Sequence, residues 1–327
     1  MSVELPAALA EAIEDQIQAV PPRELAQASA ALTARYREKR SPGGPVARTP
    51  ADLLAYLAAR LPATYAAISS VLAEVRWLRP AWQPQSVLDL GAGPGTGLWS
   101  ATAYWPGVQR ATAVEAEPQM LALGRKLATV APYVAVRDAS WVAADVTATA
   151  PGGPYDLVLL AFVLGEVPPS RLDAVIEQAA AATAITDGVT VIVEPGTPDG
   201  FARVRRAREL LLERGGSVTA PCPHDAACPI PNGDWCHFSV RLARSQAHRL
   251  AKSGALGYED EKFAYVAVTR GPTAHAEARI LRHPQTRPGN IRLELCTPAG
   301  LTSQVVTRSQ KEAFRQARKA AWGDAWD

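Results

Sequence analysis

The 327-residue sequence lacks several features that would assign it to a special class. It contains no apolar run close to the roughly 18 residues that a membrane-spanning helix needs. Its first residues show no basic segment followed by an apolar stretch, and the early acids Glu4, Glu11, Glu14 and Asp15 are atypical of a transit peptide. Lys and Arg number 34 against 32 Asp and Glu, so the overall charge identifies no partner. We expect a cytoplasmic globular protein that binds neither membrane nor DNA.

Cysteine is scarce, and all four cysteines fall in the C-terminal third: Cys222, Cys228, Cys236 and Cys296. Prolines on both sides of Cys222 and after Cys228 keep the backbone extended, so loops rather than a helix would present these sulfurs. Four thiolates can complete the tetrahedral shell of zinc or hold an iron–sulfur cluster. The clustering therefore predicts a metal site with these four residues as ligands.

Three other interpretations of the cysteines are open. Free cysteine is often a small buried apolar residue, although Pro, His and Asp neighbours are unusual in a core. Disulfides would need an oxidising compartment, which nothing in the sequence indicates. Zinc is the strongest rival of an iron–sulfur cluster, because His224, His237 or His248 could replace one thiolate. The gaps between the cysteines are wider than in zinc fingers, which disfavours zinc without excluding it.

The pattern of apolar residues divides the chain into three parts. Residues 1–80 have helical spacing, broken by Ser41-Pro42-Gly43-Gly44-Pro45. Residues 81–270, with a cysteine-rich insertion at about 218–240, alternate between strands and helices, which predicts a parallel sheet with helices on both faces. Residues 271–327 form a small strand-rich extension with a basic helix. We expect strands at 86–90, 110–115, a segment reaching 136, 155–162, 189–193 and 262–270, and helices at 98–105, 118–129, 170–184 and 199–214.

A glycine-rich turn follows the first expected strand, in Asp89-x-Gly91-x-Gly93-x-Gly95. Glycines there allow a tight turn into a helix, so that a ligand can approach the backbone amides at the helix N-terminus. Thr96 stands where the dinucleotide fingerprint needs its third glycine, and no Gly-Lys-Ser/Thr follows as in a P-loop. The pattern is that of class I S-adenosylmethionine (SAM) methyltransferases. An α/β fold of this Rossmann-like class is therefore predicted.

Two acids further along the chain agree with a SAM site. Glu115 ends the second strand, where a carboxylate can accept both ribose hydroxyls. Asp145, followed by Val146, stands where these enzymes recognise the adenine amino group. The alternative is that the glycines only make a tight turn in a fold that no longer binds a ligand.

No catalytic group is evident beside this site. SAM is already activated, so the protein chiefly has to align a nucleophile with the methyl group. The segment after the fourth strand, Leu164-Gly165-Glu166-Val167-Pro168-Pro169, lacks the Asp/Asn-Pro-Pro-aromatic motif of amino-group methylases. Glu166 is a candidate base or a helix cap. The sequence thus leaves open whether methyl transfer is catalysed.

Three clusters of basic residues lie around or beyond the cysteines. Solvated helix faces explain many such clusters, but three near one metal site favour a polyanionic partner. In the last helix Trp322 and Trp326 are expected one turn apart, where they could stack on exposed bases. The clusters are Arg203, Arg205, Arg206 and Arg208; Arg241, Arg244, Arg249 and Lys252; and Arg308, Lys311, Arg315, Arg318 and Lys319.

Four segments are distinctive: Val193-Glu194-Pro195-Gly196-Thr197-Pro198, Ala220-Pro221-Cys222-Pro223-His224, Asp234-Trp235-Cys236-His237-Phe238 and Tyr258-Glu259-Asp260-Glu261-Lys262-Phe263-Ala264-Tyr265. They resemble the Rsm22 family, the methyltransferase-like proteins of the mitochondrial small ribosomal subunit and their bacterial relatives. The resemblance runs from about Leu54 to the C-terminus and includes Trp322-Gly323-Asp324.

This resemblance implies a class I methyltransferase fold with an inserted cysteine loop, in which cysteines matching Cys222, Cys228, Cys236 and Cys296 hold a [4Fe–4S] cluster. It also implies binding to the small ribosomal subunit and its 16S-type rRNA, either as a methyltransferase or as an assembly factor without catalysis. We expect a bacterial, cytoplasmic member because the sequence shows no organellar presequence. A small-molecule methyltransferase held together by zinc is the remaining alternative.

Overall fold

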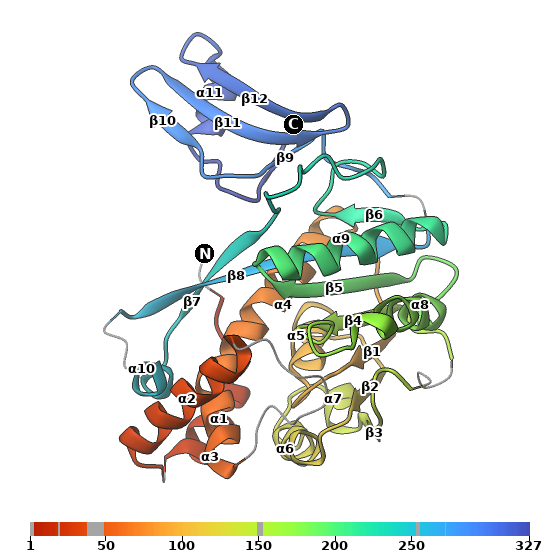
Figure 1. Cartoon of the computed structure of the whole chain (residues 1–327), viewed down its shortest axis with the longest axis vertical. Coiled ribbons are helices and arrows are strands. Elements are labelled where there is room, and N and C mark those ends of the chain that lie inside the picture. Colours follow the sequence, from red (N-terminus) through yellow and green to blue (C-terminus); the bar gives the residue numbers. More distant parts are fainter. Residues whose placement is uncertain (1–2, 19, 38–48, 149–152, 253–255, 272) are drawn as a thin grey trace.

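Figure 1 shows the computed structural model, in which residues 3–18, 20–37, 49–148, 153–252, 256–271 and 273–327 are described. Its central sheet has the strand order β3-β2-β1-β4-β5-β8-β6, with β7 also paired to β8. The first five strands are parallel, and β8 lies antiparallel between β5 and β6. The strands are β1 (Ser86–Leu90), β2 (Arg110–Glu115), β3 (Ser140–Ala143), β4 (Leu157–Ala161), β5 (Val189–Pro195), β6 (Ser217–Ala220), β7 (Phe238–Ala243) and β8 (Tyr258–Thr269).

Helices cover both faces of this sheet, because its central strands are almost wholly apolar and are buried on both sides. On one face α4 (Leu61–Leu78), α5 (Thr96–Tyr104), α6 (Pro118–Ala128) and α7 (Val134–Arg137) contribute to one apolar core. On the other face α8 (Leu172–Ala182), preceded by the 3-10 turn η2 (Pro169–Arg171), and α9 (Pro198–Glu213) enclose a second core. The sheet order and the two helical layers confirm the expected α/β methyltransferase fold.

The N-terminal part is helical, as expected, and packs at the side of the sheet (Figure 1). It comprises α1 (Ala7–Ile17), α2 (Pro22–Arg37), α3 (Pro50–Ala55) and a π-helical turn, η1 (Tyr56–Arg60), which continues into α4. Thr49 caps α3 and forms a capping box with Asp52. A helix between β7 and β8, α10 (Gln246–Lys252), packs against α2. No helix among the described residues is long and apolar enough to cross a membrane.

Residues 273–327, here called the C-terminal extension, form a separate antiparallel sheet at one end of the molecule (Figure 1). This sheet has its own small apolar core, which includes Ile291, Leu293 and Ala317. Its elements are β9 (Ala278–Ile280), β10 (Gln285–Arg287), β11 (Asn290–Thr297), β12 (Gly300–Thr307), α11 (Lys311–Ala317) and β13 (Ala325–Trp326).

Two local expectations were wrong. The segment reaching Val136 is one helical turn, α7, in which the amides of Val136 and Arg137 donate to the Tyr133 carbonyl, and the third strand begins only at Ser140. The last helix ends at Ala317, so the two tryptophans are not one turn apart. Gly323 has φ of 96°, and Trp326 pairs with Ala278 in β13–β9. The break expected at Ser41–Pro45 lies outside the described residues.

Candidate functional site

The glycine turn lies between β1 and α5, at the carboxyl edge of the parallel strands. Gly91, Gly93 and Gly95 all adopt positive φ, at 71°, 53° and 83°. Only glycine adopts this backbone region readily, which explains the spacing of the motif. Gly95 is the N-cap of α5, so the turn presents the start of that helix to the sheet edge.

Asp89 lies beneath this turn rather than on its open side. Its side chain is buried, and the backbone amides of Gly97 and Leu98 at the start of α5 donate to its carboxylate. A methyl group built on Gly97 would lie 2.5 Å from an Asp89 carboxylate oxygen. Burial, reinforced by the charge of Glu115, raises the pKa of Asp89 to about 7. Asp89 therefore positions the glycine turn from below.

Glu115 at the end of β2 is buried and joins the turn to the next loop. Its Oε2 accepts the Gly93 amide at 2.7 Å, and its Oε1 accepts the Glu117 amide at 2.8 Å. A carboxylate oxygen can accept a second hydrogen bond, so both oxygens keep capacity for a diol such as the ribose of SAM. The hydrogen-bond acceptors at this edge are of the kind that would bind the ribose hydroxyls of SAM.

Asp145 and Val146 follow β3 on the same edge. The Ala144 amide donates to the Glu115 carbonyl at 3.2 Å, which holds this segment beside the end of β2. The Asp145 side chain is exposed, and its Oδ1 accepts the Thr147 amide at 2.7 Å. The structure thus brings the glycine turn, Glu115 and Asp145 to one edge, here called the adenosyl site; their contact with a cofactor stays a prediction.

Two features of this edge escaped the sequence analysis. The Tyr56 hydroxyl lies 3.5 Å from a methyl group built on Gly93, and burial raises the pKa of Tyr56 to about 12. Tyr56 starts the π-helical turn, for which no sequence signal was available. Fully buried Glu194, at the end of β5, accepts the Leu164 amide at 3.0 Å and pairs with Arg203 at 2.7 Å. This pair fixes the loop after β4, where Glu166 is exposed.

The four cysteines line a single cavity of about 40 Å³, between the central sheet and the C-terminal extension. Cys222, Cys228 and Cys236 belong to the loop between β6 and β7, and Cys296 lies on β11. We call this space the cysteine cavity. It brings together residues 74 positions apart, so it connects the extension to the inserted loop.

The four cysteines of the cysteine cavity form no disulfide, and Cys296 is buried whereas the other three are half-buried. Burial raises the pKa of Cys296 to about 12 and that of Cys236 well above its usual value, with the other cysteines adding to both shifts. His224 is buried with Nε2 at 3.5 Å from the Cys296 sulfur. In the described parts of the chain, no three His, Cys, Asp or Glu side chains are grouped closely enough to hold a single ion. Metal binding by the four cysteines stays a prediction.

Two buried arginines border the cysteine cavity. Arg208 on α9 donates through Nη2 to the carbonyls of His224 and Ala226, at 2.8 and 2.7 Å. Arg279 on β9 donates to the Pro221 and Gly323 carbonyls and pairs with Glu74 of α4 at 2.6 Å. Arg279 therefore joins the helical layer, the cysteine loop and the C-terminal extension.

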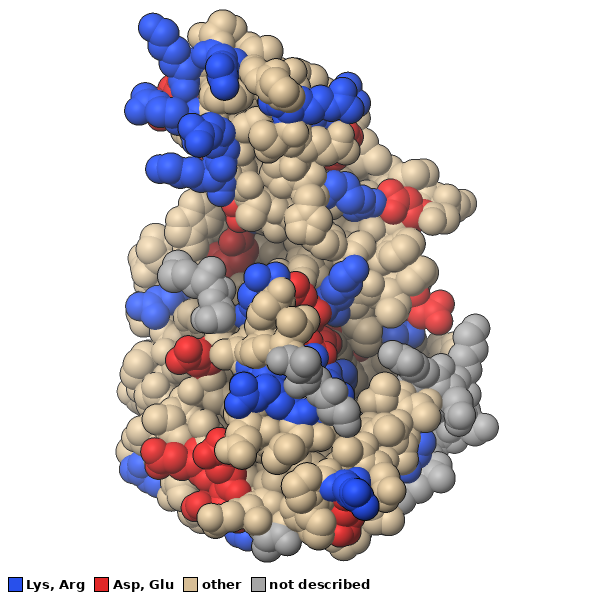
Figure 2. All heavy atoms as spheres, turned by 90° about the vertical axis from the view of Figure 1, so that its left-hand side faces the viewer, with Lys and Arg blue, Asp and Glu red and all other residues tan. Residues whose placement is uncertain are grey.

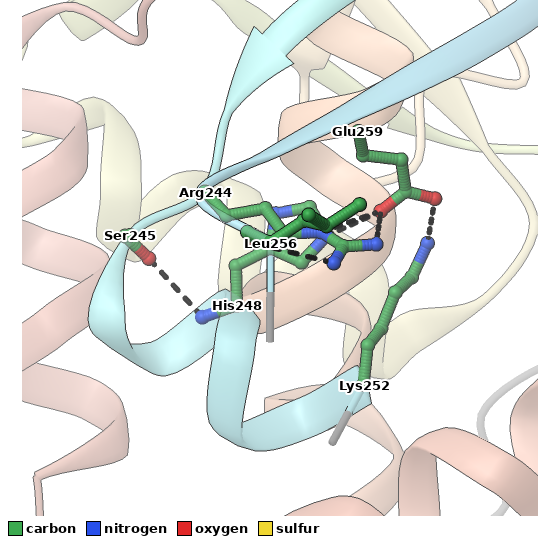
Figure 3. A network of polar contacts seen from close by, with 6 residues as sticks. All are labelled: Arg244, Ser245, His248, Lys252, Leu256 and Glu259. Atoms are coloured by element: carbon green, nitrogen blue, oxygen red, sulfur yellow. Dashed lines mark hydrogen bonds and ion pairs between the residues drawn. The ribbon is translucent and has the colours of Figure 1, made fainter. Parts of the chain in front are cut away.

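Two of the three basic clusters are largely neutralised by acids of the chain itself. On α9, Arg206 pairs with Asp173. In the second cluster, Arg241 pairs with Asp260. Arg244, Lys252 and the buried His248 all contact Glu259 of β8 (Figure 3). Although burial alone would raise the pKa of Glu259, hydrogen bonds from His248 and Lys252 bring it well below its usual value.

The third basic cluster, in the C-terminal extension, is more exposed than the other two. Arg308, Lys311, Arg315, Arg318 and Lys319 are all exposed, and Arg315 contacts Glu312. Figure 2 shows Lys and Arg concentrated at the end of the molecule that the C-terminal extension forms.

Comparison with known proteins decides the family. The family described as mitochondrial small ribosomal subunit Rsm22 matches residues 50–327. The chain belongs to the Rsm22 family. The resemblance stated from the Cys, His and Trp segments is thereby confirmed.

Two curated relatives of this Rsm22 family chain are named for ribosome assembly. Human mitochondrial ribosome assembly protein METTL17 is 32% identical over 291 residues, covering 83% of this chain and 61% of the relative. Mitochondrial ribosome assembly protein RSM22 of Saccharomyces cerevisiae is 23% identical, covering 53% of this chain and 44% of the relative. The chain thus spans about half the length of the curated relatives that it matches.

Two solved structures to which this chain is similar are methyltransferases. Magnesium protoporphyrin IX methyltransferase of Synechocystis PCC 6803, with bound SAM, is 13% identical with a TM-score of 0.42, and the match covers 83% of this chain and 100% of that one. The N-methyltransferase NodS of Bradyrhizobium japonicum is 14% identical with a TM-score of 0.39, covering 61% of this chain and 84% of that one.

Proposed function

We propose that this chain binds SAM, carries a [4Fe–4S] cluster and acts in assembly of the small ribosomal subunit by binding its 16S-type rRNA. One observation supports this proposal most. The cysteine cavity is lined by residues of both the methyltransferase-type domain and the C-terminal extension, and the extension carries exposed basic residues. Ribosome assembly is what the names of its relatives state.

The volume of the cysteine cavity favours a cluster over zinc in this proposal. Zinc sits about 2.3 Å from each of four thiolates, so the sulfurs close around the ion and leave no space between them. The cysteine cavity has about 40 Å³ of space, whereas a single water needs only about 10–15 Å³. When bound, a cluster would supply four metal–sulfur bonds that tie Cys296 of the extension to the loop cysteines.

The exposed basic residues of the C-terminal extension support an RNA partner. Lys311, Arg315, Arg318 and Lys319 lie on or directly after α11. Basic side chains neutralise phosphates and release counterions, so each phosphate contact steepens the salt dependence of binding. The two neutralised clusters offer less to a polyanion, because their own carboxylates already compete for the guanidinium groups.

Sedimentation with purified small subunits at increasing salt tests this interface. A variant with Lys311, Arg315, Arg318 and Lys319 all changed to Gln should bind more weakly, and its slope of log K against log salt should fall by about three. Arg206→Gln and Arg241→Gln, which remove paired charges, serve as controls and should leave the slope unchanged. Equal binding of the fourfold variant and the wild type would contradict the RNA-binding proposal.

Methyl transfer is the second part of the proposal. The adenosyl site supports it, because SAM needs mainly a correctly aligned nucleophile. Small subunits from a strain lacking the protein should accept tritiated methyl groups into their RNA. If the RNA stays unlabelled while the protein binds the subunit, the chain acts as an assembly factor without catalysis. If it binds no RNA and methylates a small molecule, the ribosomal proposal is wrong.

A further inference from the structure

Arg208 carries a positive charge inside the cysteine cavity without a carboxylate beside it. Its side chain is 4% exposed, and its Nη2 donates to two backbone carbonyls of the loop that holds Cys222 and Cys228. Its Nε has no hydrogen-bond partner, and no ion pair reaches Arg208 within the described ranges of the chain. Arginine stays protonated at all ordinary pH values. An uncompensated buried charge is strongly unfavourable, and the groups that hydrogen-bond Arg208 do not balance its charge.

Two neighbouring arginines, unlike Arg208, have their charge balanced by a carboxylate. Arg279, which is 2% exposed at the same cavity, forms an ion pair with Glu74 at 2.6 Å. Arg206, on the same helix as Arg208, is half-buried and pairs with Asp173 at 2.6 Å. Arg208 alone of these three has only neutral acceptors.

The residues that line the cysteine cavity include no Asp or Glu, so negative charge can come only from sulfur or from an occupant. Arg208 already hydrogen-bonds the Cys222 sulfur. Metal binding converts thiols to thiolates and releases their protons. Four thiolates around a [4Fe–4S] core with a charge of about +2 leave a net negative group, which would balance a guanidinium.

We propose that Arg208 is the positioning residue of the cysteine site: its buried charge selects a net anionic, thiolate-ligated occupant, and its unpartnered Nε–H donates to a sulfur of that occupant. This inference rests on the metal site proposed above. It assigns to Arg208 control over loading and reduction potential, because charge and hydrogen bonds to sulfur set both properties in thiolate-held clusters.

The experiment compares wild type, Arg208→Gln, Arg208→Lys and the control Arg206→Gln, all full-length and purified without oxygen. Gln removes the charge but keeps an amide donor for the two loop carbonyls, whereas Lys keeps the charge. Each protein is titrated with Co²⁺ and followed by its thiolate absorption bands, then reconstituted with iron and sulfide. Reduction potentials are measured by spectroelectrochemistry.

We expect Arg208→Gln to bind Co²⁺ about tenfold to a hundredfold more weakly, as is usual when a partner of the metal ligands is lost. The potential of its cluster should shift to more negative values, because the reduced state carries more negative charge and loses more stabilisation than the oxidised state when the cation is removed. Arg208→Lys should restore most of the potential, and Arg206→Gln should match the wild type.

The outcomes separate this inference from the proposed function. If the wild type loads a cluster and Arg208→Gln shows the same affinity and potential, Arg208 has no such role and the inference is wrong, while the metal site stands. If the wild type takes up neither Co²⁺ nor iron and sulfide, both are wrong. If Arg208→Gln does not fold, Arg208→Lys decides the question. A reduction potential as close to the wild type as that of Arg206→Gln supports the role of the charge. Loss of cluster loading in Arg208→Lys overturns it.

Discussion

The adenosyl site and the cysteine cavity differ in how complete they are without a ligand. At the adenosyl site both oxygens of Glu115 accept backbone amides, and the carboxylate of Asp89 accepts amides at the start of α5. Most polar groups there have partners within the chain, although one buried carboxylate oxygen of Asp89 and the Thr96 hydroxyl have none among the described residues. In the cysteine cavity the thiols face a buried guanidinium that has no carboxylate partner. The second site therefore has a buried charge that its own lining residues do not balance.

The difference also concerns distance along the chain. The adenosyl site is built from residues 89–146, within successive strand–helix units that form one sheet edge. The cysteine cavity needs α9, the β6–β7 loop and β11, together with Glu74 of α4 through its pair with Arg279. Loss of one contact should therefore have mostly local effects at the first site and should loosen the C-terminal extension at the second.

The largest effect is expected for Cys296→Ser, which removes the only cavity cysteine that the extension contributes. We expect loss of metal uptake and rapid proteolysis of residues 273–327, because the bonds that tie the extension to the loop are gone. Iron, sulfide and zinc analysis and limited proteolysis measure both. Thr297→Ser on the same strand is the control. Full metal content together with wild-type protease resistance would show that the four sulfurs share no metal.

Arg279→Met should have the next largest effect. It leaves Glu74 without its partner and removes the donors to the Pro221 and Gly323 carbonyls. Breaking a buried ion pair costs about 3–5 kcal/mol of unfolding free energy. Chemical denaturation of the metal-free protein measures this, and Arg287→Met, at an exposed position of β10, is the control. If the unfolding free energy falls by less than about 1 kcal/mol, which is typical of a surface ion pair, Arg279 does not stabilise the contact between the extension and the rest of the protein.

Sequence reasoning placed the glycine turn, Glu115 and Asp145 at successive strand ends because the signals for them are local. The glycine spacing reports backbone positions with positive φ, and Glu115 ends a strand that follows directly. It also found the four cysteines, since a scarce residue type that clusters is easily seen. Trp322 was assigned to a helix, whereas it packs against His237 and His283. Helical spacing cannot reveal that the chain turns at Gly323.

The basic clusters show why the remainder could not be predicted. Arg203, Arg206 and Arg208 read as one cationic group on a helix, yet they point to three different surroundings. Arg203 pairs with buried Glu194, Arg206 pairs with exposed Asp173, and Arg208 enters the cysteine cavity. Which acid neutralises a basic residue depends on the neighbouring element in space, and the sequence spacing within α9 does not contain that information.

At the adenosyl site, Asp89→Asn should increase stability. Because the pKa of Asp89 is raised to about 7 from 3.8, the folded protein binds more protons than the unfolded chain between these values. Stability of the wild type therefore falls as the pH rises from about 4 to 7, and stays level above that. The variant should equal the wild type near pH 4 and exceed it at pH 8, by at most about 4 kcal/mol.

Denaturation at several pH values measures this difference, with Asp15→Asn on the exposed face of α1 as the control. A variant that is less stable than the wild type at pH 8 would show that the charged carboxylate, through its bonds to the Gly97 and Leu98 amides, stabilises the turn more than burial disfavours it.

The smallest effect is expected for Glu115→Gln, measured as SAM affinity by calorimetry. One oxygen of Glu115 would be replaced by an NH₂ group facing the amide of Gly93 or Glu117, and the charge that would receive the ribose hydroxyls would be lost. A hydrogen bond to a charged group contributes about 1.5–3 kcal/mol, so affinity should fall at least about tenfold. Asp138→Asn, before β3 at the opposite edge of the sheet, is the control. Unchanged affinity in both variants would mean that Glu115 does not bind the ribose of SAM.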